Sequence, residues 1–73
     1  MSIYEEKCRF QCESDAGKTY VVIEQIRVST RIAIQKTDYI TDDGEIVMRL
    51  DDQHFLILLR DELLSIRKEM REH

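Results

Sequence analysis

The chain has 73 residues, 42% hydrophobic and 36% charged, with a formal net charge of −4 at pH 7. This length allows one small domain, whose core confers little stability without a disulfide, a metal or self-association. The acidic balance, with no cluster of basic residues, argues against nucleic-acid binding. The longest apolar run, 55–59, is too short to span a bilayer, and 1–6 lack the apolar stretch of a secretory signal. We therefore expect a cytoplasmic protein without membrane contact.

The two cysteines, Cys8 and Cys12, lie in an alternating polar and apolar segment that predicts a strand over 7–14. Four residues on a strand span about 13 Å, at a rise of ~3.3 Å each. A disulfide requires Cα atoms roughly 4.4–6.8 Å apart, so these cysteines cannot bridge each other. Both are expected to point to the side of Phe10 as buried, reduced thiols.

After a hairpin turn at Gly17, the run from 20 to 34 gives the clearest strand pattern in the chain. Apolar residues occupy most even positions of the run: Tyr20, Val22, Ile26, Val28, Ile32 and Ile34. This period of two is typical of a strand with one buried face. One strand over 18–36 would be unusually long, so we expect a bend or bulge near 29–31 that separates strands over 19–28 and 32–41.

An Asp-Gly turn at 42–44 predicts a second hairpin, and a weaker turn follows at 51–53. These turns separate predicted strands over 45–50 and 54–58. Short connections between consecutive strands favour an antiparallel meander. The excess negative charge lies within residues 38–52. This segment contains one basic residue, Arg49, and six acidic residues: Asp38, Asp42, Asp43, Glu45, Asp51 and Asp52.

In the last third of the chain, the spacing of the apolar residues changes. Its apolar residues are spaced by three and four: Leu56, Leu59, Leu63, Ile66 and Met70. This heptad-like spacing predicts an amphipathic helix that begins near Arg60, with Asp61 as its N-cap. The sequence thus predicts one α+β domain over 1–73, an antiparallel β-meander of four to five strands with one C-terminal amphipathic helix. The boundary between the last strand and the helix stays open, because 55–59 fit both.

Few residues in the sequence are candidates for catalysis or for binding a metal or phosphate. Cys8 or Cys12 with His54 would supply a nucleophile and a base, and these residues with His73 would supply four zinc ligands. Burial of the thiols beside Phe10 argues against catalysis, and the spacing lacks the short loop of structural zinc sites. Both glycines fall in hairpin turns, so no phosphate-binding loop exists. We expect no enzymatic activity, no cofactor and no metal.

Three fragments together resemble a family of short, functionally uncharacterised bacterial proteins: CRFQCESDAGKTYVVIE (8–24), TDDGEIV (41–47) and RLDDQHFLI (49–57). That family shares a strand, a glycine turn, a valine-rich strand and a late Asp-Asp hairpin. The resemblance implies a bacterial protein and carries no activity, and the leucine-rich tail departs from it. In topology alone, strands followed by one helix are similar to the carbon storage regulator, an RNA-binding dimer. The acidic charge argues against that function.

We expect a non-enzymatic binding or interaction module that forms a homodimer through the apolar face of the predicted helix. That face consists of Leu59, Leu63, Ile66 and Met70. Whether it packs on its own sheet or on a second chain stays open. The alternative is an acidic inhibitor or regulator, of phage or plasmid type, that presents its turns to a basic protein partner. Those turns hold Asp42, Asp43, Asp51 and Asp52.

Overall fold

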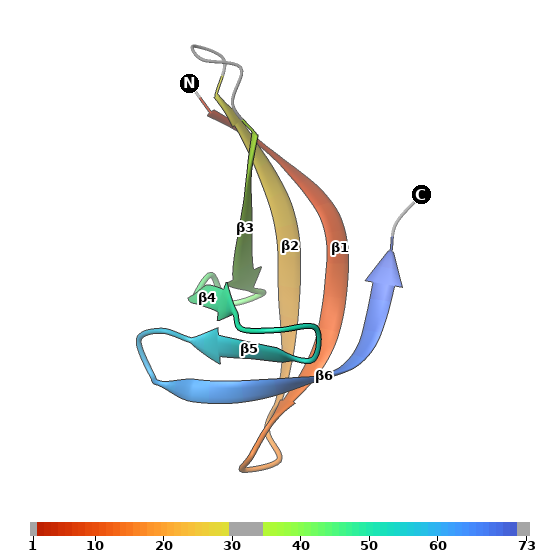
Figure 1. The fold of residues 1–73 in the computed structure, drawn as a ribbon, viewed down its shortest axis with the longest axis vertical. Coiled ribbons are helices and arrows are strands. Elements are labelled where there is room, and N and C mark those ends of the chain that lie inside the picture. The colour runs from red at the N-terminus through yellow and green to blue at the C-terminus, as the bar shows by residue number, and fades with distance from the viewer. Residues whose placement is uncertain (1, 30–34, 72–73) are drawn as a thin grey trace.

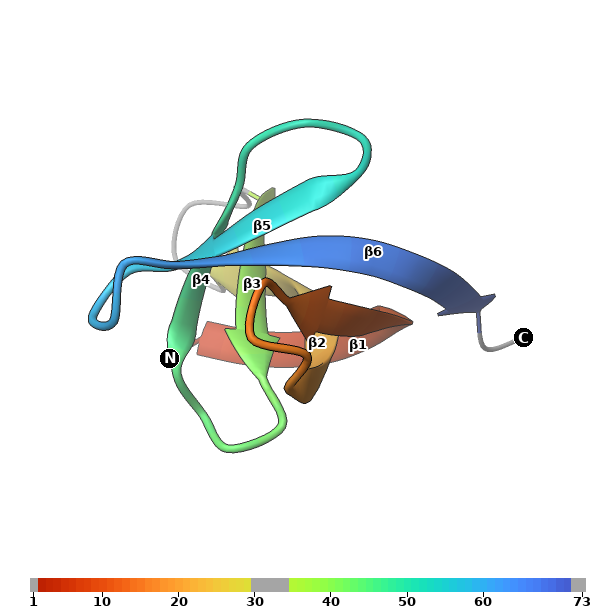
Figure 2. The same cartoon turned by 90° about the horizontal axis from the view of Figure 1, so that it is seen from below.

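The computed structural model describes residues 2–29 and 35–71, which form six β-strands and contain no helix. The strands are β1 (Ser2–Ser14), β2 (Thr19–Ser29), β3 (Gln35–Thr41), β4 (Ile46–Arg49), β5 (His54–Ile57) and β6 (Glu62–Arg71). Each pairs antiparallel with the next, and β6 pairs with β1, so the sheet closes into a barrel (Figures 1 and 2). This closed, six-stranded, all-β architecture shows that the predicted α+β fold, a meander of four to five strands with a C-terminal helix, was wrong. Over the described ranges, nothing has the form of a membrane-spanning helix.

The predicted strands over 7–14, 19–28, 45–50 and 54–58 correspond to β1, β2, β4 and β5, and the segment 32–41 overlaps β3. β2 ends at Ser29 and pairs antiparallel with β3, which begins at Gln35, so the expectation that 18–36 do not form one strand is confirmed. The bend itself was placed near 29–31, and positions 30 and 31 lie outside the described residues.

Alternate strand positions fill the interior of the barrel. The buried core consists of Cys8, Phe10, Cys12, Tyr20, Val22, Val47, Phe55, Ile57 and Leu64. Phe55 is fully buried, and its ring centroid lies 5.3 Å from that of Phe10 and 5.2 Å from that of Tyr39. The prediction that Cys8 and Cys12 are buried, unbridged thiols beside Phe10 is confirmed.

β6 occupies the segment for which the sequence predicted a helix. Asp61 adopts a left-handed conformation, with φ of 51°, and reverses the chain after β5 instead of capping a helix. The following residues then pair with β5 on one side and with β1 on the other. Strand alternation buries Leu64 completely and turns Leu63 outward. Pairing with the open edges of β5 and β1 therefore determines the structure of this segment, although its local apolar spacing favours a helix.

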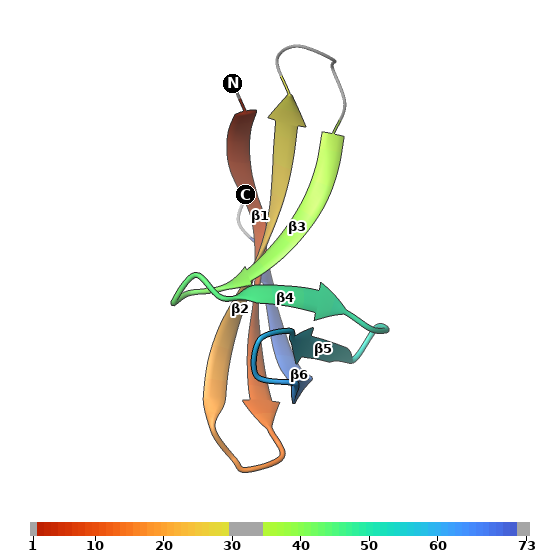
Figure 3. The ribbon, with the colours of Figure 1, turned by 90° about the vertical axis from the view of Figure 1, so that its left-hand side faces the viewer.

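Part of the sheet extends beyond the barrel (Figure 3). The register of β1 against β2 shifts between Glu6 and Cys8, which is a β-bulge that bends the strand. Among the described residues, the ladder between β1 and β6 reaches only to Cys8, and the ladder between β3 and β4 covers only Tyr39 and Ile40. The three-stranded extension, which we call the ribbon, consists of residues 2–6, 25–29 and 35–38.

Candidate interaction surface

The outer surface of the barrel is apolar where β3, β4, β5 and β6 lie side by side. In one row, Met48 lies opposite Leu56, and Leu56 lies opposite Leu63. A second row begins where Ile40 lies opposite Ile46. Leu58, the residue after β5, continues this row, because its backbone N–H donates to the Ile46 carbonyl. We call these side chains the apolar face: Ile40, Ile46, Met48, Leu56, Leu58 and Leu63.

Several side chains of the apolar face are open to solvent. The exposed fractions are 59% for Ile46, 46% for Met48, 45% for Leu58 and 37% for Leu63. The adjacent residues Val47, Ile57 and Leu64 are buried on the other side of these strands, as strand alternation requires. Single exposed apolar residues are common on soluble proteins, but a contiguous apolar surface of this kind marks an interaction site. The apolar face is therefore the leading candidate site.

A groove of about 740 Å³ runs between the ribbon and β4, and the apolar face forms its corner. The groove is lined there by Ile40, Ile46, Met48 and Leu58, and along the ribbon by Tyr4, Arg27, Lys36, Thr37 and Asp38. Arg27 and Lys36 lie directly opposite each other in the β2–β3 ladder, and Arg27 Nε lies 3.8 Å from Asp38 Oδ2. The groove thus joins an apolar corner to a charged wall in which positive charge exceeds negative charge.

Arg49 lies where the groove meets the barrel interior. Its guanidinium carbon is 5.2 Å from the ring centroid of Phe10, 5.8 Å from that of Tyr39 and 5.5 Å from that of Phe55. These distances are within the range of cation–π attraction. Arg49 Nη1 also donates to the Tyr39 hydroxyl, which donates to Glu24. The bond with Tyr39 raises the pKa of Arg49, and burial raises the pKa of Tyr39, so the pair remains a cation and a neutral hydroxyl at neutral pH.

The predicted acidic surface is divided between two turns at opposite ends of β4, with Asp42 and Asp43 before the strand and Asp51 and Asp52 after it. The Asp51 carboxylate stabilises the turn in which it lies. Its Oδ1 accepts a hydrogen bond from the Gln53 backbone N–H at 2.8 Å and lies 2.9 Å from His54 Nδ1. The Gln53 bond, followed by the His54 contact, lowers the pKa of Asp51. The structure therefore does not bring the four carboxylates into one site.

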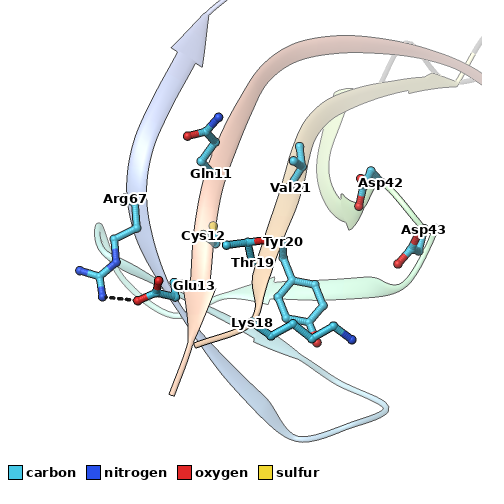
Figure 4. Close-up of a pocket in the computed structure, with 10 residues that line it drawn as sticks. All are labelled: Gln11, Cys12, Glu13, Lys18, Thr19, Tyr20, Val21, Asp42, Asp43 and Arg67. Atoms are coloured by element: carbon cyan, nitrogen blue, oxygen red, sulfur yellow. Dashed lines mark hydrogen bonds and ion pairs between the residues drawn. The ribbon is translucent and has the colours of Figure 1, made fainter. Parts of the chain in front are cut away.

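Asp42 and Asp43 line a second hollow, of about 460 Å³, on the outer surface of β1 and β2 (Figure 4). Lys18 and Arg67 line the same hollow, and Arg67 Nη2 donates to Glu13 Oε1 at 3.0 Å. Charges of both signs thus share this surface, which gives it no strong preference for an anion or a cation.

The predicted helix face does not exist as one surface. Leu59 lies in the β5–β6 turn with 85% of its surface exposed, Ile66 packs against the core, and Met70 lies opposite Arg9 in the β1–β6 ladder. Only Leu63 belongs to the apolar face. A strand turns alternate residues to opposite sides, so residues three and four apart do not share one surface as they do on a helix.

The candidate catalytic residues lie on different sides of the barrel wall. His54 is half-buried on the outer surface beside Asp51 and lines neither hollow, whereas Cys8 and Cys12 lie in the core. Burial raises the pKa of Cys12 to about 11, which keeps the thiol protonated at neutral pH. Within 2–29 and 35–71, no group of three or more His, Cys, Asp or Glu residues could hold a metal ion. His73, the fourth suggested zinc ligand, lies outside these ranges.

The fold and the surface define a small closed antiparallel β-barrel with an apolar outer face. No protein family, curated protein or solved structure matches the chain at a significant level.

Proposed function

We propose that this protein is a non-enzymatic interaction module that self-associates, and that the apolar face is its contact surface. The observation that carries the proposal is the contiguous row of Met48, Leu56 and Leu63 across three neighbouring strands, continued by exposed Ile46. Covering this surface adds apolar burial to a domain whose own core is small. A second copy is a suitable partner, because an isologous contact brings the same apolar surface from both sides.

Sedimentation equilibrium of the wild type and of Met48→Glu tests this proposal. The wild type is expected to dimerise in the micromolar range, and the substitution to yield a monomer because it would bury a charge in an apolar contact. Gln11→Glu adds the same charge at an exposed position of β1 outside the apolar face and should leave the dimer intact. Circular dichroism verifies that both variants are folded. A wild type that remains monomeric at high micromolar concentration contradicts the proposal.

A second candidate function is an acidic regulator that binds a basic protein through Asp42 and Asp43. These residues are exposed, and among the described residues no ion pair involves their carboxylates. Asp51 is a weaker candidate because its carboxylate organises its own turn.

Capture of partners from the native cell tests this second candidate. A partner retained by the wild type is expected to be lost with the double variant Asp42→Asn/Asp43→Asn. It should be kept with Glu5→Gln/Asp15→Asn, which removes the same charge from other exposed positions. Equal capture by both double variants argues against this function.

A further inference from the structure

We propose that two copies join along the free edge of β3, with residues 36–38 of each copy paired antiparallel about a two-fold axis at Thr37. This inference rests on the proposed self-association and specifies the backbone contact that orients the two copies. It identifies the partner at the groove as a second copy of this chain.

The first support is the direction of the backbone groups. In the described part of the sheet, the β3–β4 ladder begins at Tyr39, so 36–38 pair on the β2 side alone. The Thr41 N–H donates to the Glu45 carbonyl, on the β4 side of the strand. Alternate residues of a strand direct their N–H and C=O groups to the same side. Thr37, four residues before Thr41, therefore presents both groups to the free edge.

The second support is the charge pattern along this edge. A pair centred on Thr37 exchanges two backbone hydrogen bonds between the two Thr37 residues and places Lys36 opposite the partner's Asp38, twice in the dimer. These flanking pairs are of the closely spaced, non-hydrogen-bonded type, where opposite charges stabilise the sheet. The neighbouring two-fold registers would place Lys36 opposite the partner's Lys36, or Asp38 opposite the partner's Asp38. Charge therefore selects the register centred on Thr37.

The third support is an unfavourable pair within one copy. Arg27 and Lys36 lie directly opposite each other, and like charges in this arrangement destabilise a sheet. Asp38 of the same chain lies 3.8 Å from Arg27, and among the described residues Lys36 forms no ion pair. The partner's Asp38 would place a carboxylate beside Lys36 and offset the repulsion.

The edge also continues into the apolar face. Residues 36–38 line the same groove as Ile40, Ile46 and Met48. Three residues from each copy form only a short ladder, and the apolar corner beside it supplies additional area for the contact. Pairing would also cover the exposed backbone of an edge strand, which otherwise invites irregular association.

Charge reversal tests the register. Lys36→Asp and Asp38→Lys each turn two opposite-charge pairs into like-charge pairs, so each is expected to weaken dimerisation about tenfold or more at low salt. The double variant Lys36→Asp/Asp38→Lys restores opposite charges in reversed order and should recover the affinity. Lys68→Asp and Asp15→Lys make the same charge changes at exposed positions outside the groove and should have little effect.

The outcomes separate this inference from the proposed function. A monomeric wild type overturns both. A wild-type dimer that Met48→Glu disrupts, but that tolerates each single charge reversal, supports the apolar face and overturns the edge pairing. Hydrogen exchange gives a readout without substitutions, because the Thr37 amide should be protected in the dimer and exposed on dilution to monomer. Equal exchange rates in the two states also overturn the edge pairing.

Discussion

The guanidinium carbon of Arg49 lies 5.5 Å from the ring centroid of Phe55, at the opening of the barrel interior. The same side chain donates through Nε to the Asp51 carbonyl at 3.1 Å and through Nη2 to the Asp52 carbonyl at 3.4 Å. Arg49 therefore covers the aromatic core and holds the turn between β4 and β5.

Replacing Arg49 with lysine should lower the free energy of unfolding by about 1–2 kcal/mol, because lysine keeps the charge but loses the planar fork of donors. Urea denaturation measures the change. Arg27→Lys, on the ribbon, serves as the control and should cost less than about 0.5 kcal/mol. Similar losses at the two positions would show that the contacts of Arg49 add nothing specific.

Phe55 and Leu59 distinguish the barrel from the predicted helix. Phe55 is fully buried between two aromatic rings, so Phe55→Leu should lower the free energy of unfolding by about 1–3 kcal/mol. Leu59 is 85% exposed, so Leu59→Ala should change the free energy of unfolding by less than about 0.5 kcal/mol. Thermal and urea unfolding give both values. A large loss at Leu59 would instead favour the packed helix face.

The pKa of Cys12, raised by burial to about 11, predicts a loss of stability in alkali. The unfolded thiol ionises at its ordinary pKa of 9.0, so the folded state holds more protons between about pH 9 and 11. Stability from this group is complete below pH 9 and should fall by at most roughly 3 kcal/mol as pH rises through that window. Urea denaturation of the wild type and of Cys12→Ala at several pH values isolates the contribution, because the alanine variant lacks it.

The pKa of Asp51 is lowered by its bonds to Gln53 and His54, which predicts the opposite dependence. The stabilisation is present above the ordinary pKa of 3.8 and is lost as pH falls through the lower folded value. Asp51→Asn should therefore be less stable than the wild type at pH 5, and the gap should narrow below pH 3.8. Urea midpoints measured in acid check this convergence. A constant gap would show that ionisation of Asp51 does not matter.

The turns and most strands could be predicted because their information is local. Gly17 and Gly44 both adopt positive φ, at 82° and 90°, as the predicted hairpins require. The Ser14 N–H donates to the Lys18 carbonyl and the Gly44 N–H to the Thr41 carbonyl, which closes both turns. Short polar turns between alternating segments were sufficient to define these antiparallel pairs.

The last strand could not be recognised in the same way, because its apolar residues satisfy two periods. Leu63, Ile66 and Met70 fit a helix, whereas Leu64 and Ile66 alternate as in a strand. Only the open edges of β5 and β1, which are tertiary features, decide between the two. The apolar face was missed for a related reason. Its members come from four strands and the turn after β5, and they can be recognised as neighbours only when the register is known.

Closure of the barrel also has a kinetic consequence. The Cys8 thiol donates to Glu69 Oε1 at 3.5 Å, across a separation of 61 residues along the chain. Every pairing between β1 and β6 requires a comparably long loop to close, whereas the other ladders join neighbouring segments. Folding by such non-local contacts is slow, because chain entropy is lost before the core contacts of β6 form. The hairpins are thus expected to assemble first, and the joining of the two ends of the sheet to limit the rate.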